Sequence, residues 1–158
     1  MRPTQGPFPR TRLRRTRQSP EIRALVAETT LSASDMIWPF FVREGTAMEE
    51  PVPSRPGGVR RSVDKAVEAA REAADLGIPA ICLFPYTEAH NRSSDCAEAW
   101  NPDNLSNRAP RAIKDAVPDI AIMTDVALDP YSDTGHDGFV VDGEIVNDAS
   151  VEALVKQA

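Results

Sequence analysis

The sequence has little cysteine and no long hydrophobic run, and each absence excludes a class of protein. Its two cysteines, Cys82 and Cys96, form no CxxC pair, and we expect neither a disulfide between them nor a catalytic role for either. No run approaches the ~20 apolar residues of a membrane span. Residues 1–23 contain no apolar segment of the kind that a secretory signal needs. We therefore expect no membrane association and a cytoplasmic location.

Charge is distributed unevenly along the chain. Residues 1–23 contain seven arginines and one acid, a net charge of +6, whereas the remaining 135 residues contain 11 bases and 23 acids, a net charge of −12. Four prolines in this segment argue against a long amphipathic helix, and no aromatic residue lies among the arginines from Arg10 to Arg23 to stack on bases. We expect no nucleic-acid partner, and instead an arm that docks on an acidic surface of a neighbouring subunit.

Apolar runs alternate with amphipathic segments from residue 36 onward, which predicts a parallel sheet of the α/β class. Strands are expected at 36–42, 78–84 and 120–128, helices at 62–77, 105–116 and 149–158, and loops at 43–61 and 86–104. Ser62 and Ser150 are the expected N-caps, and Gly77 suits the position after a helix end. A TIM barrel has eight strands in ~250 residues, so three strands would form less than half of one.

Four aspartates, Asp125, Asp129, Asp133 and Asp137, follow the third apolar run at four-residue intervals. Prolines and glycines argue against a helix, and the segment lies where parallel α/β folds place active sites, after a strand end. One interpretation is a calcium loop at 133–144, although a strand precedes it. Another is an active-site segment whose carboxylates orient a substrate amine, relay protons or hold a hard cation such as Mg2+. The third is a set of Asx-turns.

Several motifs together resemble one family. "DVALDPYSDTGHDG", "LVAETTLSASDMIWPFFVREG", "VPSRPGGVRRSVD" and "LGIPAICLFP" are similar, in colinear order from about Arg10, to porphobilinogen synthase (5-aminolevulinate dehydratase). The resemblance implies a TIM barrel with an extended N-terminal arm, here residues 1–30, with residues 31–158 forming the first βα units. It also implies a lyase that condenses two molecules of 5-aminolevulinate to porphobilinogen, with loss of two waters, in haem biosynthesis. Such enzymes commonly assemble as octamers through the arm.

The resemblance also assigns roles within the aspartate segment. Zinc-dependent members carry three cysteines, at the positions held here by Ala127, Asp129 and Asp137, and carboxylates disfavour zinc. The chain therefore resembles the aspartate-rich branch, which uses Mg2+ at a regulatory or active site, or no metal. We expect Asp125, Asp129 and Asp137 to be catalytic, with Asp129 and Asp137 as metal ligands, and no role for Asp133.

The family also uses two lysines that form Schiff bases with substrate. The three lysines here, Lys65, Lys114 and Lys156, all lie in expected helices. The chain is thus expected to be the N-terminal portion of the enzyme, without the nucleophilic lysines. The alternative is a catalytically inactive short product that at most associates with full-length subunits.

Overall fold

The computed structural model describes residues 6–158, and the chain divides into two compact units, Met1–Ser32 and Ala33–Ala158. The described residues of the first unit form a 3-10 turn, η1 (Arg15–Arg17), and a short helix, α1 (Pro20–Leu25). Ser19 caps α1, since its side-chain oxygen accepts a hydrogen bond from the Ile22 N–H at 3.3 Å, and Pro20 suits the first helical position. Five large apolar side chains among the described residues of this unit are exposed: Phe8, Leu13, Leu25, Val26 and Leu31.

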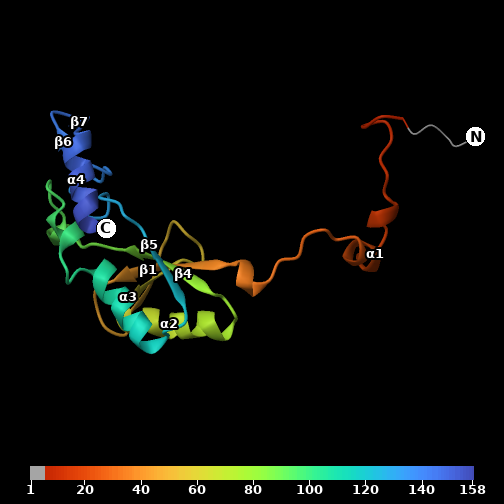
Figure 1. The fold of residues 1–158 in the computed structure, drawn as a ribbon, viewed down its shortest axis with the longest axis horizontal. Helices are drawn as coiled ribbons and strands as arrows, with labels where there is room; N and C mark the ends of the chain where they lie inside the picture. Colours follow the sequence, from red (N-terminus) through yellow and green to blue (C-terminus); the bar gives the residue numbers. More distant parts are fainter. Residues whose placement is uncertain (1–5) are drawn as a thin grey trace, which may run out of the picture. The chain divides into compact units, whose positions relative to one another are not determined.

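The second unit is built on a five-stranded sheet in the order β2-β3-β1-β4-β5 (Figure 1). Its strands are β1 (Ile37–Arg43), β2 (Glu49–Pro51), β3 (Val59–Ser62), β4 (Ala80–Pro85) and β5 (Ala121–Thr124). β3, β1, β4 and β5 are parallel, and β2 pairs antiparallel with β3. The predicted α/β class is confirmed. The sheet formed by the described residues is open and does not close into a barrel.

The second unit also contains helices and short 3-10 turns. They are η2 (Ala33–Asp35), α2 (Val63–Asp75), η3 (Ala89–Asn91), η4 (Ala97–Trp100), α3 (Leu105–Ala116) and α4 (Asn147–Gln157). The helices predicted at 62–77 and 105–116 correspond to α2 and α3. Pro110 lies inside α3, beyond its first turn. Among the residues that the structure describes, no helix combines the length and apolar character needed to cross a membrane.

Helices α2 and α3 pack together against one face of the sheet and form the main core (Figure 1). The core residues are Phe40, Val42, Ala66, Ala69, Ala70, Ala73, Ile81, Leu83, Leu105, Ala109, Ile113 and Ile120. Alternate residues of a strand point to opposite faces, so Phe40 and Leu83 face the helices. Burial of each large apolar side chain contributes roughly 1.5–3 kcal/mol.

Gly77 ends α2 as predicted. Its φ is +77°, a conformation that glycine adopts without steric cost. The Ile78 N–H donates to the Ala73 carbonyl at 2.9 Å, and the Gly77 N–H donates to the Ala74 carbonyl at 3.0 Å, which is the Schellman arrangement. Ser62 occupies the N-cap position of α2, but its hydroxyl accepts from the Met48 N–H at 2.9 Å instead of capping the helix.

The prediction of a loop over 43–61 is wrong in part, because β2 and β3 lie within it. Opposite charges pair across these two strands: Arg61 Nε lies 3.0 Å from Glu49 Oε1, and an Arg60 guanidinium nitrogen lies 3.3 Å from Glu50 Oε1. Cross-strand pairs of this kind stabilise a short ladder without apolar alternation.

The segment after β5 also differs from the prediction. β5 ends at Thr124 instead of residue 128, and a hairpin of β6 (Val140–Val141) and β7 (Glu144–Ile145) precedes α4. Asp142 and Gly143 have φ values of +53° and +84°, as a type I′ turn requires. The predicted cap Ser150 is wrong: α4 begins after Val146, and the Ser150 hydroxyl donates to the Val146 carbonyl at 2.6 Å.

Candidate active site

The parallel strands β1, β4 and β5 end at the same edge of the sheet, and the candidate site lies there. In the register of the sheet Phe41 pairs with Phe84, and Leu83 pairs with Thr124, so Asp125 continues the row of the two phenylalanines. These side chains lie on the face opposite α2 and α3. The rings of Phe41 and Phe84 are 5.8 Å apart. Phe41, Phe84 and Asp125 therefore lie side by side in one row, on the face of the sheet that no helix covers.

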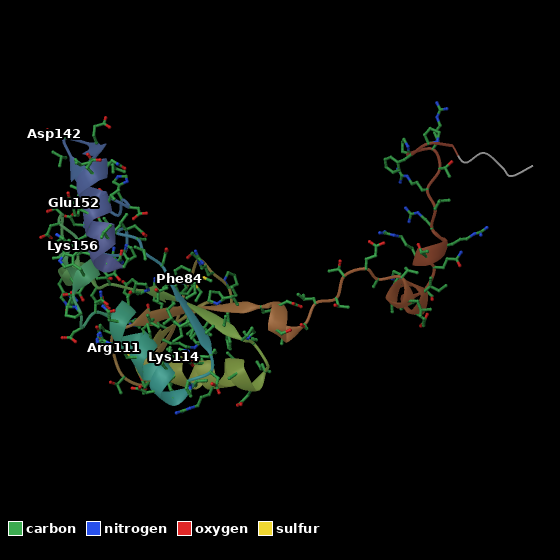
Figure 2. The ribbon with its side chains drawn as sticks, viewed as in Figure 1. Phe84, Arg111, Lys114, Asp142, Glu152 and Lys156 are labelled. Atoms are coloured by element: carbon green, nitrogen blue, oxygen red, sulfur yellow. The ribbon has the colours of Figure 1, made fainter. Side chains whose placement is uncertain are left out.

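A pocket of about 180 Å³, the acid pocket, opens at this edge. It is lined by Phe41, Phe84, Pro85, Asp125, Ala127, Asp129, Pro130, Tyr131 and Gln157. Phe84 is labelled in Figure 2, on the sheet of the second unit. Two of the three predicted catalytic residues, Asp125 and Asp129, thus share one pocket whose floor is aromatic. A small ligand with a cationic group and a short apolar chain would fit this combination.

The carboxylates of the pocket influence one another. The pKa of Asp129 is raised, first by partial removal from solvent, then by the negative charges of Asp137 and Asp125, while Arg92 acts in the opposite direction. Burial, and then the charge of Asp125, raises the pKa of the Cys82 thiol. Cys82 thus lies close to Asp125 and stays protonated at neutral pH, which does not suit a thiolate nucleophile.

The Asp137 side chain stabilises the loop that follows β5. Its Oδ1 accepts a hydrogen bond from the backbone N–H of Leu128 at 2.6 Å, and this contact closes the segment between the two residues. Asp137 does not line the acid pocket, although it is near enough to Asp129 to raise the pKa of that carboxyl. Asp133 is exposed and also lies outside the pocket.

A second hydrophobic cluster anchors this loop to distant parts of the unit. It consists of Cys96, Ala99, Leu128, Tyr131 and Ala153, from the loop, η4 and α4. The Tyr131 side chain is buried, and its hydroxyl lies 2.7 Å from the hydroxyl of Ser106 on α3. Burial is the main cause that raises the pKa of Tyr131. The loop that carries the aspartates is therefore fixed by packing on one side of the pocket.

Gln157 is a pocket residue that the sequence did not indicate. Its Nε2 donates to the Ala127 carbonyl at 3.0 Å, while its Oε1 is buried without a hydrogen-bond partner among the described residues. A buried acceptor without a partner is costly, so a ligand donor in the pocket would satisfy it. Only the tertiary contact between α4 and the loop reveals this residue, because nothing distinguishes it in the sequence of the helix.

The calcium-loop interpretation is wrong. Glu144, which would be the last ligand of such a loop, lies on β7, and β5 with its following turn stands where the motif requires a helix. Within residues 6–158, no three His, Cys, Asp or Glu side chains gather in a group that could hold a metal ion.

The lysines lie away from the acid pocket. Lys65, Lys114 and Lys156 are on α2, α3 and α4, and none of them lines the pocket. Lys114 and Lys156 are labelled on their helices in Figure 2. The ammonium group of Lys65 is 2.7 Å from Glu68, that of Lys114 donates to the Pro118 carbonyl at 2.9 Å, and that of Lys156 is 5.5 Å from the Trp100 ring centre.

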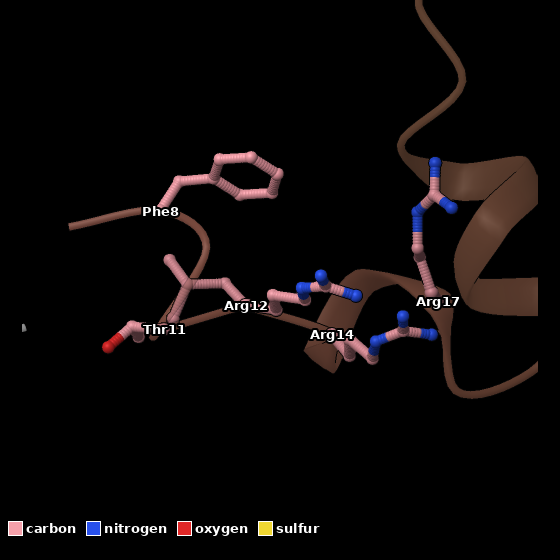
Figure 3. Close-up of a pocket in the computed structure, with 6 residues that line it drawn as sticks. Phe8, Thr11, Arg12, Arg14 and Arg17 are labelled. Carbon is pink, nitrogen blue, oxygen red and sulfur yellow. The ribbon is translucent and has the colours of Figure 1, made fainter. Parts of the chain in front are cut away.

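The first unit has a pocket of its own, of about 520 Å³ (Figure 3). It is lined by Phe8, Thr11, Arg12, Leu13, Arg14 and Arg17. The Arg12 guanidinium lies 5.6 Å from the centre of the Phe8 ring. The lining offers positive charge and apolar surface, and it contains no acid.

Comparisons with known proteins agree on one family. The family model of delta-aminolevulinic acid dehydratase matches residues 10–158. A protein from Rhodobacter capsulatus with that name is 46% identical over 152 residues, which are 96% of this chain and 46% of that protein. A protein of the same name from Bradyrhizobium diazoefficiens is 47% identical over 147 residues, which are 93% of this chain and 42% of that protein.

A solved structure is similar as well. It is the crystal structure of delta-aminolevulinic acid dehydratase (porphobilinogen synthase) from Toxoplasma gondii in complex with the reaction product porphobilinogen. The TM-score is 0.86 at 42% sequence identity, and the match covers 93% of this chain and 42% of that chain. The chain thus spans about half the length of the curated relatives it matches.

Proposed function

The chain belongs to the delta-aminolevulinic acid dehydratase family, and from this premise we propose that it contributes the acid pocket to a porphobilinogen synthase. The reaction joins two molecules of 5-aminolevulinate and releases two waters. The observation that carries the proposal is the position of Asp125 and Asp129, together in one pocket at the carboxyl ends of parallel strands. In the TIM barrels of enzymes this is the edge at which chemistry occurs. We propose that the open sheet β1-β4-β5 corresponds to consecutive strands of such a barrel.

We assign the binding of the substrate amine to Asp125 and Asp129. 5-Aminolevulinate carries an ammonium group, and two carboxylates that repel each other gain most from a cation between them. Asp129 has a raised pKa, so it takes up and releases protons at a higher pH than an ordinary aspartate, which suits a group that relays protons during a condensation. The attack on the substrate carbonyl is assigned to none of the three lysines, since all lie outside the pocket.

Asp137 is proposed as a positioning residue. Its hydrogen bond to the Leu128 N–H fixes the chain just before Asp129, so the carboxylate acts on the substrate through the loop. The same carboxylate raises the pKa of Asp129, which gives it an electrostatic influence on the pocket besides its structural one.

We propose that the site does not depend on zinc. Ala127, Asp129 and Asp137 stand where zinc-dependent members carry cysteines, and carboxylate oxygens suit Mg2+ instead. Asp129 and Asp137 fit such an ion in charge and donor type, because Mg2+ is usually held by one or two carboxylates together with water. When bound, Mg2+ would supply positive charge beside the pocket and would lower the pKa of Asp129.

We propose that the first unit, as an arm, docks on a second copy of the chain in an octamer. Residues 1–32 carry seven arginines against Glu21 and Glu28, a net charge of +5, whereas residues 33–158 carry 11 bases and 22 acids, a net charge of −11. Opposite charge and the exposed apolar side chains of the arm support such an interface. Native mass measured at rising salt tests it: dissociation toward smaller species is expected, and a salt-independent monomer would contradict the arm's role. We also propose a cytoplasmic location for the protein.

The experiment that tests the proposed activity is the incubation of the full-length protein with 5-aminolevulinate. Porphobilinogen and residual substrate are measured together, and two substrate molecules are expected to disappear for each product molecule formed. Substrate that remains intact, or a product formed from one molecule of substrate, would refute the proposed function.

A further inference from the structure

Gln157 is the last residue of α4, and its side chain joins this helix to the acid pocket. Its Nε2 donates to the Ala127 carbonyl at 3.0 Å, and the residue lines the pocket together with Asp125 and Asp129. Ala127 stands midway along the chain between these two aspartates. The Gln157 amide therefore contacts the backbone segment that carries both carboxylates of the pocket.

This contact determines the orientation of the Gln157 amide. A carbonyl oxygen can only accept a hydrogen bond, so the Ala127 carbonyl requires the Nε2 side of the amide. A flipped amide would place two oxygens against each other. Oε1 is consequently the atom that is left for another donor, and it is buried and accepts no hydrogen bond within residues 6–158.

Contacts elsewhere on α4 fix the face that the helix turns toward the pocket. Ala153 lies one helical turn before Gln157, on the same face, and is buried in the second hydrophobic cluster with Tyr131. Further along the same face, the Ser150 hydroxyl accepts from the Phe139 N–H at 2.9 Å. The position of Gln157 at the pocket therefore follows from the packing of the whole helix.

The polar lining of the acid pocket consists mainly of hydrogen-bond acceptors. It contains Asp125 and Asp129 but no lysine, arginine or histidine. The Tyr131 hydroxyl lies 2.7 Å from the hydroxyl of Ser106, so the other polar groups are the two carboxylates and Gln157 Oε1. A primary ammonium group has three N–H donors and no acceptor. Its donors match the three acceptors of the lining in number and in kind.

Resting on the proposed function, we infer that Gln157 is a third binding residue for the ammonium group of 5-aminolevulinate, whose N–H bonds go to Asp125, Asp129 and Gln157 Oε1. Gln157 then makes the pocket selective for a primary amine, because an N-methyl group removes one donor and leaves an acceptor without a partner. The neutral amide also accepts a hydrogen bond without adding a third negative charge to two carboxylates that already repel each other.

Two ligands that lack the ketone test this contact without chemistry. 5-Aminopentanoate has the ammonium and carboxylate groups of the substrate, and 5-(methylamino)pentanoate has one N–H fewer. Their dissociation constants are measured by calorimetry on the full-length protein and on its Gln157→Met and Gln157→Glu variants. Methionine removes the amide, whereas glutamate keeps an acceptor oxygen. Asn147→Leu is the matched control, since it removes an exposed amide of α4 outside the pocket.

Methylation should weaken binding to the parent protein about tenfold, the low end for a hydrogen bond to a charged group. In Gln157→Met this penalty should fall below about threefold, because the methyl group takes the place where no acceptor remains. Gln157→Glu and Asn147→Leu should keep the tenfold penalty. If Gln157 only held the loop, Gln157→Met would weaken both ligands alike and leave the methylation penalty unchanged.

Three results would overturn the inference: no binding of 5-aminopentanoate by the parent protein, no methylation penalty in the parent protein, or equal penalties in the parent protein and Gln157→Met. The first two need no variant, so they apply even where Gln157→Met does not fold. The two proposals fail separately. A methylation penalty that depends on Gln157, in a protein that forms no porphobilinogen, would contradict the proposed function. Normal porphobilinogen formation with equal penalties would contradict the role of Gln157 alone.

Discussion

Replacement of Asp137 separates the two effects assigned to this residue, its hold on the loop and its charge. The Oδ1 of Asp137 accepts from the Leu128 N–H at 2.6 Å, and a hydrogen bond to a charged group contributes roughly 1.5–3 kcal/mol. Because Asp137 is exposed, we take the low end of this range. Asp137→Ala should then open the loop about tenfold more often, since 1.4 kcal/mol corresponds to a factor of ten. Asp137→Asn keeps an oxygen acceptor and should lose about half of this free energy, since neutral hydrogen bonds are about half as strong.

The assay is hydrogen exchange at the Leu128 amide in the full-length protein. Exchange should accelerate about tenfold in Asp137→Ala, and about threefold in Asp137→Asn. Asp133→Ala is the control, because Asp133 is exposed and its carboxylate makes no hydrogen bond among the described residues. Unchanged exchange in Asp137→Ala, or equal acceleration in the control, would refute the assignment of Asp137 as the residue that closes the loop.

The pKa of Asp129 reports the charge of Asp137 independently of the loop. Asp137 raises that pKa, so removal of its negative charge in Asp137→Asn should lower it. Titration of the Asp129 carboxyl by NMR provides the measurement. A residue with a purely structural role would leave this pKa unchanged when the loop stays closed.

Three further predictions concern the same region. Burial and neighbouring negative charge raise the pKa of Asp129 in the folded state, so its contribution to stability is fully present below the unfolded pKa of about 4 and is lost as the pH rises through the folded value. Asp129→Asn should therefore raise Tm at neutral pH and not at about pH 3, and an equal shift at both pH values would contradict the electrostatic cause. Tyr131→Phe should reduce the free energy of unfolding by roughly 0.5–1.5 kcal/mol, and in a double-mutant cycle with Ser106→Ala the two losses should not add, because the hydroxyls lie 2.7 Å apart. A chelator selective for zinc should leave turnover of the full-length protein within about twofold, since a lost essential metal costs far more, and inactivation reversed by zinc alone would refute the carboxylate argument.

The parallel sheet and its two covering helices could be predicted because hydrophobic periodicity determines them. The spacing of Ala66, Ala70 and Ala73 fixes the buried face of α2, and all three are fully buried. The apolar strand around Ile81 is enclosed by helices on one face only. Its other face, which carries Cys82 and Phe84, leads to the pocket.

The sequence pattern did not predict the elements that polar contacts stabilise. β2 and β3 depend on ion pairs between Glu49 and Arg61 and between Glu50 and Arg60, and such pairs have no periodic signature in the sequence. Ser150 resembles an N-cap because its residue type is right. Its hydroxyl instead accepts from the Phe139 N–H at 2.9 Å, which a local pattern cannot show.

The aspartate segment was predicted as a site, and the catalytic and metal-binding roles assigned to its residues stay predictions. The four-residue spacing does not distinguish Asp125 from Asp137. In the structure, Asp125 lines the acid pocket, whereas the Asp137 carboxylate accepts a hydrogen bond from the Leu128 N–H and closes the loop. The place of Gln157 in the acid pocket arises from a contact between segments far apart in the sequence. A single sequence indicates such residues only where a motif already links them.

The most direct test of the account compares turnover of 5-aminolevulinate in Asp125→Asn and Asp133→Asn variants of the full-length protein. The two substitutions make the same chemical change, one inside the acid pocket and one outside it. Asp125→Asn should lower kcat more than roughly tenfold, the low end for loss of a positioned acid or base, and Asp133→Asn should leave it within about twofold, as for an exposed surface change. Equal turnover in the two variants would contradict the claim that the pocket at the end of β5 is the site of the chemistry.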